Sequence, residues 1–462
     1  MNMTFAGPQD GAPRPLYLVA DHDAAGFLAA RAAAERAWLG AAGFTGALGQ
    51  LAVLPGADGA PAAAVFGMGT PAARRRGRFH LAKAAAELPA GAWRIEGGLS
   101  AEAAAEAALG WLLGAYRFGR YKAAPAQKAK LVCPAGVDAR RIETLAASEA
   151  LTRDLVNTPA SDMGPEELER AFMALAAEFG ARADAIRGAD LVTLGFPLVH
   201  AVGRASDRAP RLLDMRWGDT GPALTLVGKG VCFDTGGLDL KTAPLMGLMK
   251  KDMGGAATVM GLARSIMALG LPLRLRVLVP AVENAVAGNA FRPGDILTSR
   301  KGLTVEINNT DAEGRLILAD ALALADEERP DLIVSMATLT GAARVAVGPD
   351  LAPFYTDDDP LASALAASGA RVADPVWRMP FWDPYEAMIE PGIADLDNAP
   401  SGGFAGSVTA ALFLRRFVTA APRYAHFDIY CWQPTAQPGR PKGGVGQGAR
   451  AILDALPAVL GL

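Results

Sequence analysis

Carboxylates and lysines gathered in two short segments are the residues of this chain best suited to chemistry. The first segment runs from residue 227 to 255 and the second from 309 to 316, and each follows a run of β-forming residues. We therefore expect both segments to lie where strands end. The acids are Asp234, Asp252, Asp311 and Glu313, and the lysines are Lys229 and Lys241.

Acids brought this close together repel one another unless cations neutralise them, and divalent metal ions do this most effectively. Asp311 and Glu313 are two residues apart, so in extended backbone their side chains project to the same side. Two divalent ions about 3.5–4 Å apart can together activate a water molecule and polarise a carbonyl group. The pattern therefore favours metal-assisted hydrolysis, although the same acids could also be solvated loop residues near helix starts.

Other kinds of site fit the sequence less well. Gly228-Lys229 is not followed by Ser or Thr, and Gly228-x-Gly230 lacks the third glycine of a dinucleotide-binding loop. The three cysteines and four histidines are scattered, which excludes a disulfide framework, a CxxC zinc site and an HExxH motif. Any metal chemistry must therefore depend on carboxylates.

The composition of the chain is that of a globular protein. Its 462 residues are too many for one small core, and 51% of them are hydrophobic, too many for a disordered chain. With 45 basic and 48 acidic residues, the chain lacks the basic excess of a dedicated nucleic-acid binder. We find no signal-peptide pattern and no apolar run of about 18 residues, so we expect a cytoplasmic protein without a membrane helix.

The elements that must position these residues follow an α/β pattern. We predict two domains, a smaller N-terminal α/β domain (1–150) and a larger C-terminal catalytic domain (151–462) with a mixed sheet covered by helices. In the first, the expected strands are 16–20, 51–54, 63–66 and 130–132, and the expected helices are 72–88, 101–121 and 138–156. In the second, they are strands 223–227, 273–279, 303–307 and 332–336 and helices 255–269 and 315–327.

The two chemical segments together resemble the signatures of the leucyl aminopeptidase family of cytosolic metallo-aminopeptidases. The resemblance rests on the octet NTDAEGRL at 309–316 and on the VGKGVCFDTGG stretch at 227–237. It extends through 155–159, the stretch beginning at Trp111, and the ATLTG run at 337–341. The family implies hydrolysis of the first peptide bond of short peptides that have a free α-amine.

The resemblance also implies a set of metal ligands. Asp234 and Glu313 would bridge two divalent ions, Lys229 and Asp252 would complete one site, and Asp311 would complete the other. Lys229 would then bind as a neutral amine. The ions would be Zn²⁺ or Mn²⁺, with Mg²⁺ and Co²⁺ as further candidates.

Catalytic and substrate-binding roles follow from the same resemblance. Lys241 would stabilise the charge that develops on the scissile carbonyl oxygen, and Arg315 would hold a bicarbonate ion that serves as general base. Arg315 could instead pair with a neighbouring carboxylate for structural reasons. The residues that match the lining of the substrate cleft are Met249, Thr338 and Leu339.

The family further implies a homohexamer, and it leaves open a second kind of function. Some members bind DNA as architectural or regulatory proteins, and the cluster Arg74–Arg78 is the feature that would serve such a role here. The negative net charge speaks against nucleic acid as a partner.

After residue 429 the chain departs from the family, because Tyr430 and Trp432 stand where relatives carry small residues. We therefore expect a smaller or more polar site for the N-terminal side chain of the substrate.

Overall fold

The computed structural model describes residues 3–462 and divides the chain into two compact units. The first consists of Met1–Ala150 with Thr435–Lys442, and the second of Leu151–Pro434 with Gly443–Leu462. The division falls within the long helix α6 (Ala139–Asn157). The predicted α/β class, with a smaller N-terminal part and a larger C-terminal part, is confirmed. Among the described residues, no helix is long and apolar enough to span a membrane.

The first unit is built on a five-stranded sheet in the order β2-β3-β1-β4-β5. Only the pair β2 and β3 is antiparallel. The strands are β1 (Arg14–Ala20), β2 (Leu51–Pro55), β3 (Pro61–Gly69), β4 (Gly91–Glu96) and β5 (Ala129–Leu131). The helices of this unit are α1 (Ala24–Ala29), α2 (Ala33–Ala41), α3 (Pro71–Arg74), α4 (Leu81–Glu87) and α5 (Ala101–Gly114).

The single helix predicted over residues 72–88 is wrong, because the structure breaks it into α3 and α4. Between them Phe79 has a φ of 59°, which a helix does not allow. The Phe79 side chain is buried beside Gly110, and its backbone N–H donates to the Glu106 carboxylate. Contacts with α5 thus override the helix propensity of the alanines in this stretch.

Helix α5 also ends earlier than predicted, at Gly114 instead of residue 121. The Arg117 guanidinium donates to the carbonyl oxygens of Gly114 and Tyr116, each at 2.7 Å. These bonds satisfy carbonyl groups that a longer helix would have used.

The second unit contains a mixed nine-stranded sheet. Its order is β15-β14-β17-β13-β8-β10-β7-β6, and β9 pairs with β10 beyond the end of β8. The strands are β6 (Arg182–Arg187), β7 (Arg211–Trp217), β8 (Ala223–Gly228), β9 (Gly230–Asp234), β10 (Arg274–Asn284), β13 (Leu332–Ala337), β14 (Ala352–Tyr355), β15 (Val376–Met379) and β17 (Tyr424–Asp428). Strands β17, β13, β8 and β10 are parallel neighbours.

Two small sheets accompany the large one. The first joins β11 (Ile296–Thr298), β12 (Thr304–Glu306) and β16 (Leu396–Asp397), so the strand predicted at 303–307 lies outside the main sheet. The second pairs β18 (Trp432–Gln433) with β19 (Gly443–Gly444).

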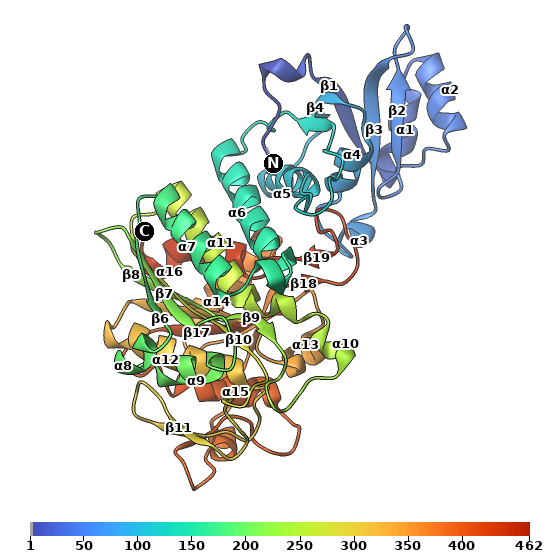
Figure 1. Cartoon of the computed structure of the whole chain (residues 1–462). Coiled ribbons are helices and arrows are strands. Elements are labelled where there is room, and N and C mark those ends of the chain that lie inside the picture. Colours follow the sequence, from blue (N-terminus) through green and yellow to red (C-terminus); the bar gives the residue numbers. More distant parts are fainter. Residues whose placement is uncertain (1–2) are drawn as a thin grey trace. The chain divides into compact units, whose positions relative to one another are not determined.

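Helices cover both faces of the large sheet (Figure 1). On one face lie α7 (Pro165–Glu178), α11 (Gly254–Leu269), α14 (Asp359–Arg371) and α16 (Ala449–Leu460). On the other lie α8 (Asp190–Thr193), α9 (Pro197–Gly203), α12 (Glu313–Glu327) and α15 (Gly406–Arg415). Two short helices, α10 (Ala243–Met246) and α13 (Gly341–Val347), follow strands β9 and β13.

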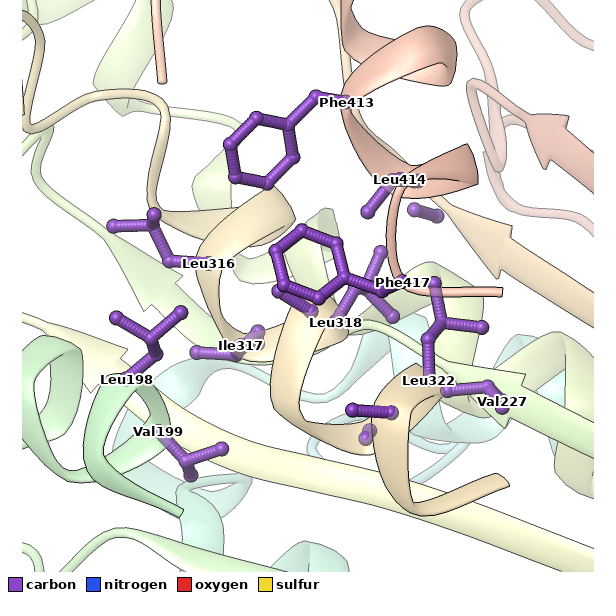
Figure 2. Close-up of a cluster of buried hydrophobic side chains, with 14 of the residues drawn as sticks. Leu198, Val199, Val227, Leu316, Ile317, Leu318, Leu322, Phe413, Leu414 and Phe417 are labelled. Atoms are coloured by element: carbon purple, nitrogen blue, oxygen red, sulfur yellow. The ribbon is translucent and has the colours of Figure 1, made fainter. Parts of the chain in front are cut away.

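Helix α12 is buried along most of its length and anchors the core on its face of the sheet. Its side chains Leu316, Ile317 and Leu318 lie among those of α9 and α15, and Phe413 of α15 lies above them (Figure 2). Burial of this kind contributes about 25 cal/mol per Å² of apolar surface removed from water. The first turn of α12, which carries Glu313, is therefore held in a fixed position.

Candidate metal centre

Five strands end at the same edge of the sheet, and their ends supply the site. Because β8, β10, β13 and β17 are parallel, their carboxyl ends lie together. Lys229 follows β8, Asp234 ends β9, and Asn284 ends β10. Thr338 follows β13, and Asp428 ends β17. The chain thus brings residues from four distant segments to one place.

Three buried carboxylates form the centre of the site. Oxygen atoms of Asp234, Asp252 and Glu313 all lie within 4.8 Å of one another. Lys229 Nζ lies between two of these groups, 2.6 Å from Asp252 Oδ2 and 2.9 Å from Glu313 Oε1. It also donates to the carbonyl oxygen of Thr338 at 3.1 Å. The sequence placed all four of these charged residues in one site, and the structure brings them together.

The position of Lys229 depends on a glycine in the facing helix. Its backbone N–H donates to the Met336 carbonyl, and its own carbonyl accepts from Ala256 N–H, so both neighbouring segments fix its main chain. A Cβ atom added at Gly314 would lie 2.6 Å from Lys229 Nζ. Only glycine leaves space for the amine at this point of α12.

A second lysine joins Asp311 to the cluster. Lys241 Nζ lies 2.8 Å from Asp234 Oδ2 and forms a short ion pair with Asp311 Oδ1. Asp311 itself stands outside the compact group of three carboxylates. The expected ligand Asp311 is therefore connected to the others through the Lys241 ammonium group.

The electrostatics show that this cluster is short of positive charge. Burial and the neighbouring Asp234 raise the pKa of Glu313 to about 8, and burial raises the pKa of Asp311 to about 6. Burial alone would lower the pKa of Lys229, but the carboxylates of Asp252 and Glu313 raise it overall. Four acids and two lysines leave two formal negative charges in a buried place.

The acceptor atoms left without donors fit a metal ion. Three buried oxygens accept no hydrogen bond in the part of the chain that the structure describes. They are both oxygens of Glu313 and Oδ2 of Asp252. The contacts of Lys229 with these two groups are those of ion pairs. Buried oxygens without donors are costly, and a divalent cation would satisfy several of them at once. The donor set, of carboxylates and an amine, suits Zn²⁺, Mn²⁺, Co²⁺ or Mg²⁺.

Arg315 lies apart from the ion pairs of the centre. It occupies the first turn of α12, where backbone N–H groups and the helix dipole favour an anion. Its Nη1 donates to the Asn398 carbonyl, and its buried Nε has no partner among the described residues. Burial lowers its pKa to about 10. No described ion pair joins Arg315 to Glu313 or Asp311, so the structural alternative considered for it is not observed.

The three residues expected to line a substrate cleft lie next to the expected metal ligands in the chain or in space. Thr338 Oγ1 donates to Asp252 Oδ1 at 2.8 Å, which orients that carboxylate. Leu339 follows directly and is half-buried against the core. Met249 begins the short 3₁₀ helix that carries Asp252 and is partly exposed.

The sequence analysis did not identify two residues that hold parts of the site in place. Asn284 Nδ2 donates to Asp234 Oδ1 at 2.9 Å and fixes that carboxylate from the end of β10. Asp428 accepts the backbone N–H groups of Leu339 and Thr340, each at 3.0 Å, and so holds the loop after β13. Both residues end strands parallel to β8, which is the signal that could have identified them.

The cysteine and histidine nearest to the site do not contribute to it. Cys232 is buried, burial raises the pKa of its thiol, and its Sγ contacts the Gly230 carbonyl. His426 is buried in β17, where its ring bonds to Ser335 Oγ at 2.8 Å. It is not among the grouped donors of the described residues.

Comparison with known proteins assigns both parts of the chain. The catalytic domain of the cytosol aminopeptidase family matches residues 150–453, and the N-terminal domain of the same aminopeptidases matches residues 14–134. A probable cytosol aminopeptidase of Syntrophotalea carbinolica is 43% identical over 312 residues. That alignment covers 66% of this chain and 62% of the relative, so the matched part spans less than two thirds of the relative.

Solved structures match over nearly the whole chain. The cytosol aminopeptidase of Coxiella burnetii is 42% identical, with a TM-score of 0.92 and 97% of each chain covered. The bottromycin maturation enzyme BotP, in complex with Mn, is 32% identical, with a TM-score of 0.86, 97% of this chain covered and 99% of BotP. These names give no support to the DNA-binding alternative. On the combined evidence of site, family match and structural likeness, the chain belongs to the cytosol aminopeptidase family of peptidases.

Proposed function

We propose that this protein is a metal-dependent aminopeptidase that releases N-terminal amino acids from short peptides. The observation that supports this most directly is the buried group of three carboxylates, Asp234, Asp252 and Glu313. Among the described residues, their only cationic partners are Lys229 and Lys241, and Glu313 Oε2 has no partner. A peptidase needs a polarised carbonyl and an activated water, and divalent ions bound at this place would supply both.

Within this proposal the acids divide into two metal sites. Asp234 and Glu313 would contribute to both sites, as the family resemblance implies. Lys229, as a neutral amine, and Asp252 complete one site, and Asp311 completes the other. The bound Mn of BotP supports a divalent ion here, with Zn²⁺, Mg²⁺ and Co²⁺ as the other candidates.

The lysine and arginine beside these ligands serve the reacting atoms. Lys241 is held by Asp234 and Asp311, and its ammonium stabilises negative charge as it develops on the scissile oxygen. Arg315 lies at a helix start, and its buried Nε has no hydrogen-bond acceptor among the described residues. This position suits a bicarbonate ion that accepts a proton from water. Met249, Thr338 and Leu339 contact the substrate. We further propose that the protein forms a homohexamer and that it works in the cytoplasm. The name cytosol aminopeptidase, which its relatives carry, supports the second point.

Metal analysis combined with hydrolysis of leucine amide tests the proposal. The wild-type protein should hold two divalent ions per chain and cleave leucine amide but not N-acetyl-leucine amide, since a free amine is required. Asp311→Ala should lose about one ion and at least about 100-fold in kcat/KM, because an interaction with the transition state is removed. Asp219→Ala, which removes an exposed acid, serves as the matched control. Full activity in Asp311→Ala would contradict the two-metal scheme.

A further inference from the structure

A buried lysine without an acidic partner lies beside the proposed metal centre. Lys251 is 6% exposed and precedes the ligand Asp252 in the chain. Among the described residues its ammonium group forms no salt bridge and no hydrogen bond, and it faces the ring of Tyr430 at 5.3 Å. A buried charge whose direct contact is an aromatic face, without an ion pair, is poorly compensated for the water it has lost.

A second cation contacts the same aromatic ring. The guanidinium carbon of Arg344, on α13, lies 5.1 Å from the centre of the Tyr430 ring. Arg344 also forms no ion pair with any carboxylate of the described chain. The adjacent Asp252 carboxylate favours the charge on Lys251, whereas the charges of Lys229 and Arg344 oppose it. Two like charges that share one tyrosine repel each other, so an anion placed between them would stabilise both.

The chain ties these three residues closely to the catalytic segments. Arg344 belongs to the helix that follows the Thr340 loop, and Tyr430 lies two residues beyond Asp428, which holds that loop. The Tyr430 backbone N–H donates to Gln447 Oε1 at 2.9 Å, which fixes the main chain that carries the ring. The cations therefore stand beside the place where the first residue of a peptide would meet the metal ligands.

We infer that Lys251, Arg344 and Tyr430 recognise a carboxylate in the N-terminal side chain of the substrate, so that glutamyl and aspartyl peptides are preferred. This inference rests on the proposed aminopeptidase function and names its substrate class. A carboxylate accepts charge-assisted hydrogen bonds from ammonium and guanidinium groups and from a phenol, and these bonds are about twice as strong as neutral ones. An uncharged leucyl side chain would leave both cations without a partner.

A comparison of glutamine and glutamate amides isolates the side-chain charge, because the two differ little in shape and neither has a C-terminal carboxylate. Wild-type enzyme loaded with Mn²⁺ should show a kcat/KM for glutamate amide at least about 10-fold above that for glutamine amide, mainly through KM. In Lys251→Met this ratio should fall to about one. Arg344→Met should also lower the ratio, and Lys251→Arg should restore most of it.

Lys128→Met, which removes an exposed lysine, is the charge-matched control and should keep the wild-type ratio. Arg344 is partly exposed, so its variant keeps the test valid if Lys251→Met does not fold. A wild-type preference for glutamine amide, or an unchanged ratio in both variants, would overturn the inference. The inference would also be overturned if the variants changed only the ratio of kcat/KM between Leu-Gly and Leu-Gly amide. The cations would then bind the C-terminal carboxylate of the peptide and not its N-terminal side chain. If no amide is cleaved, the proposed function fails as well.

Discussion

A single glycine controls the position of the lysine that we propose as a metal ligand. Gly314 faces Lys229 so closely that an added methyl group would lie 2.6 Å from the amine. Gly314→Ala should therefore displace Lys229 and lower both metal affinity and kcat/KM at least about 10-fold, although alanine favours the helix. Calorimetric titration with Mn²⁺ and hydrolysis of leucine amide measure the two effects.

The matched control for this change is Gly40→Ala in helix α2, where an added Cβ meets nothing within 4 Å. It should leave metal binding unchanged and stabilise the chain slightly, by about 0.5–1 kcal/mol. Equal metal affinity in Gly314→Ala and the wild type would mean that Lys229 does not bind the metal.

A buried histidine makes stability depend on pH. Burial lowers the pKa of His426 to about 3, whereas the unfolded chain takes up a proton near pH 6.5. As pH falls between these values the unfolded state binds more protons, so the free energy of unfolding falls by up to about 1.4 kcal/mol per pH unit. Urea unfolding from pH 7 to pH 4 should show a shallower dependence in His426→Gln than in the wild type. The exposed His22, changed to Gln, should leave the wild-type slope intact.

At the scale of elements, the loop after β13 depends on one carboxylate at the end of β17. Asp428 accepts from the N–H groups of Leu339 and Thr340 and from the hydroxyls of Thr340 and Ser407. The same loop carries Thr338, which orients Asp252. Asp428→Asn replaces one acceptor oxygen by a donor group, so it should destabilise the fold by about 1–3 kcal/mol and weaken Mn²⁺ binding.

An equivalent change elsewhere separates these two effects. Asp374 accepts three backbone N–H groups at the start of α16, far along the chain from the metal ligands. Asp374→Asn should therefore cost a similar free energy of unfolding, measured in urea, with unchanged Mn²⁺ affinity. If both variants bind Mn²⁺ as the wild type does, the Asp428 loop does not support the site.

The sequence predicted some of the strands that are buried on both faces but missed others, such as β14 and β17. Strands β8 and β13 read as continuous apolar runs, because helices cover both sides of the sheet. Strand β6, at the edge, consists of partly exposed and exposed residues and gives no such signal. The break at Phe79 arises from contacts with α5, which no local pattern contains.

The residues of the site divide in the same way, into those recognisable from local sequence and those that only the fold brings together. The carboxylates and lysines stand out because their types and spacing are unusual in themselves. Asn284 was missed because the strand predicted to end at 279 continues through Pro280, a residue that normally marks the end of a central strand. The Lys251 and Tyr430 contact joins segments about 180 positions apart, so only the fold reveals it.

For the molecule as a whole, we expect the free energy of unfolding to depend on divalent metal ions, because the buried acids Asp234, Asp252 and Glu313 outnumber the lysines beside them. Ions that bind only the folded chain raise its stability by mass action, by about 2.7 kcal/mol at 100 times the Kd. Thermal unfolding should therefore shift upward with Mn²⁺ or Zn²⁺ and downward with a chelator. Glu313→Gln should remove most of the rise in melting temperature that metal causes. Glu166→Gln, which changes an exposed acid, should leave that rise intact. A melting temperature that is insensitive to metal would contradict a buried metal centre.

The proposed hexamer can be tested through one exposed apolar stretch of the second unit. Between residues 377 and 404, the side chains of Trp377, Trp382, Ile393 and Phe404 are all more than half exposed, and Phe404 is 84% exposed. Apolar side chains concentrated in this way mark contact surfaces between proteins. We expect sedimentation to give a mass near that of six 47.8 kDa chains, and Phe404→Asp to shift it toward smaller species. Val192→Asp, at an exposed valine of helix α8 outside this stretch, should keep the wild-type mass. A single-chain mass for the wild type at micromolar concentration would contradict the hexamer and leave these side chains unexplained.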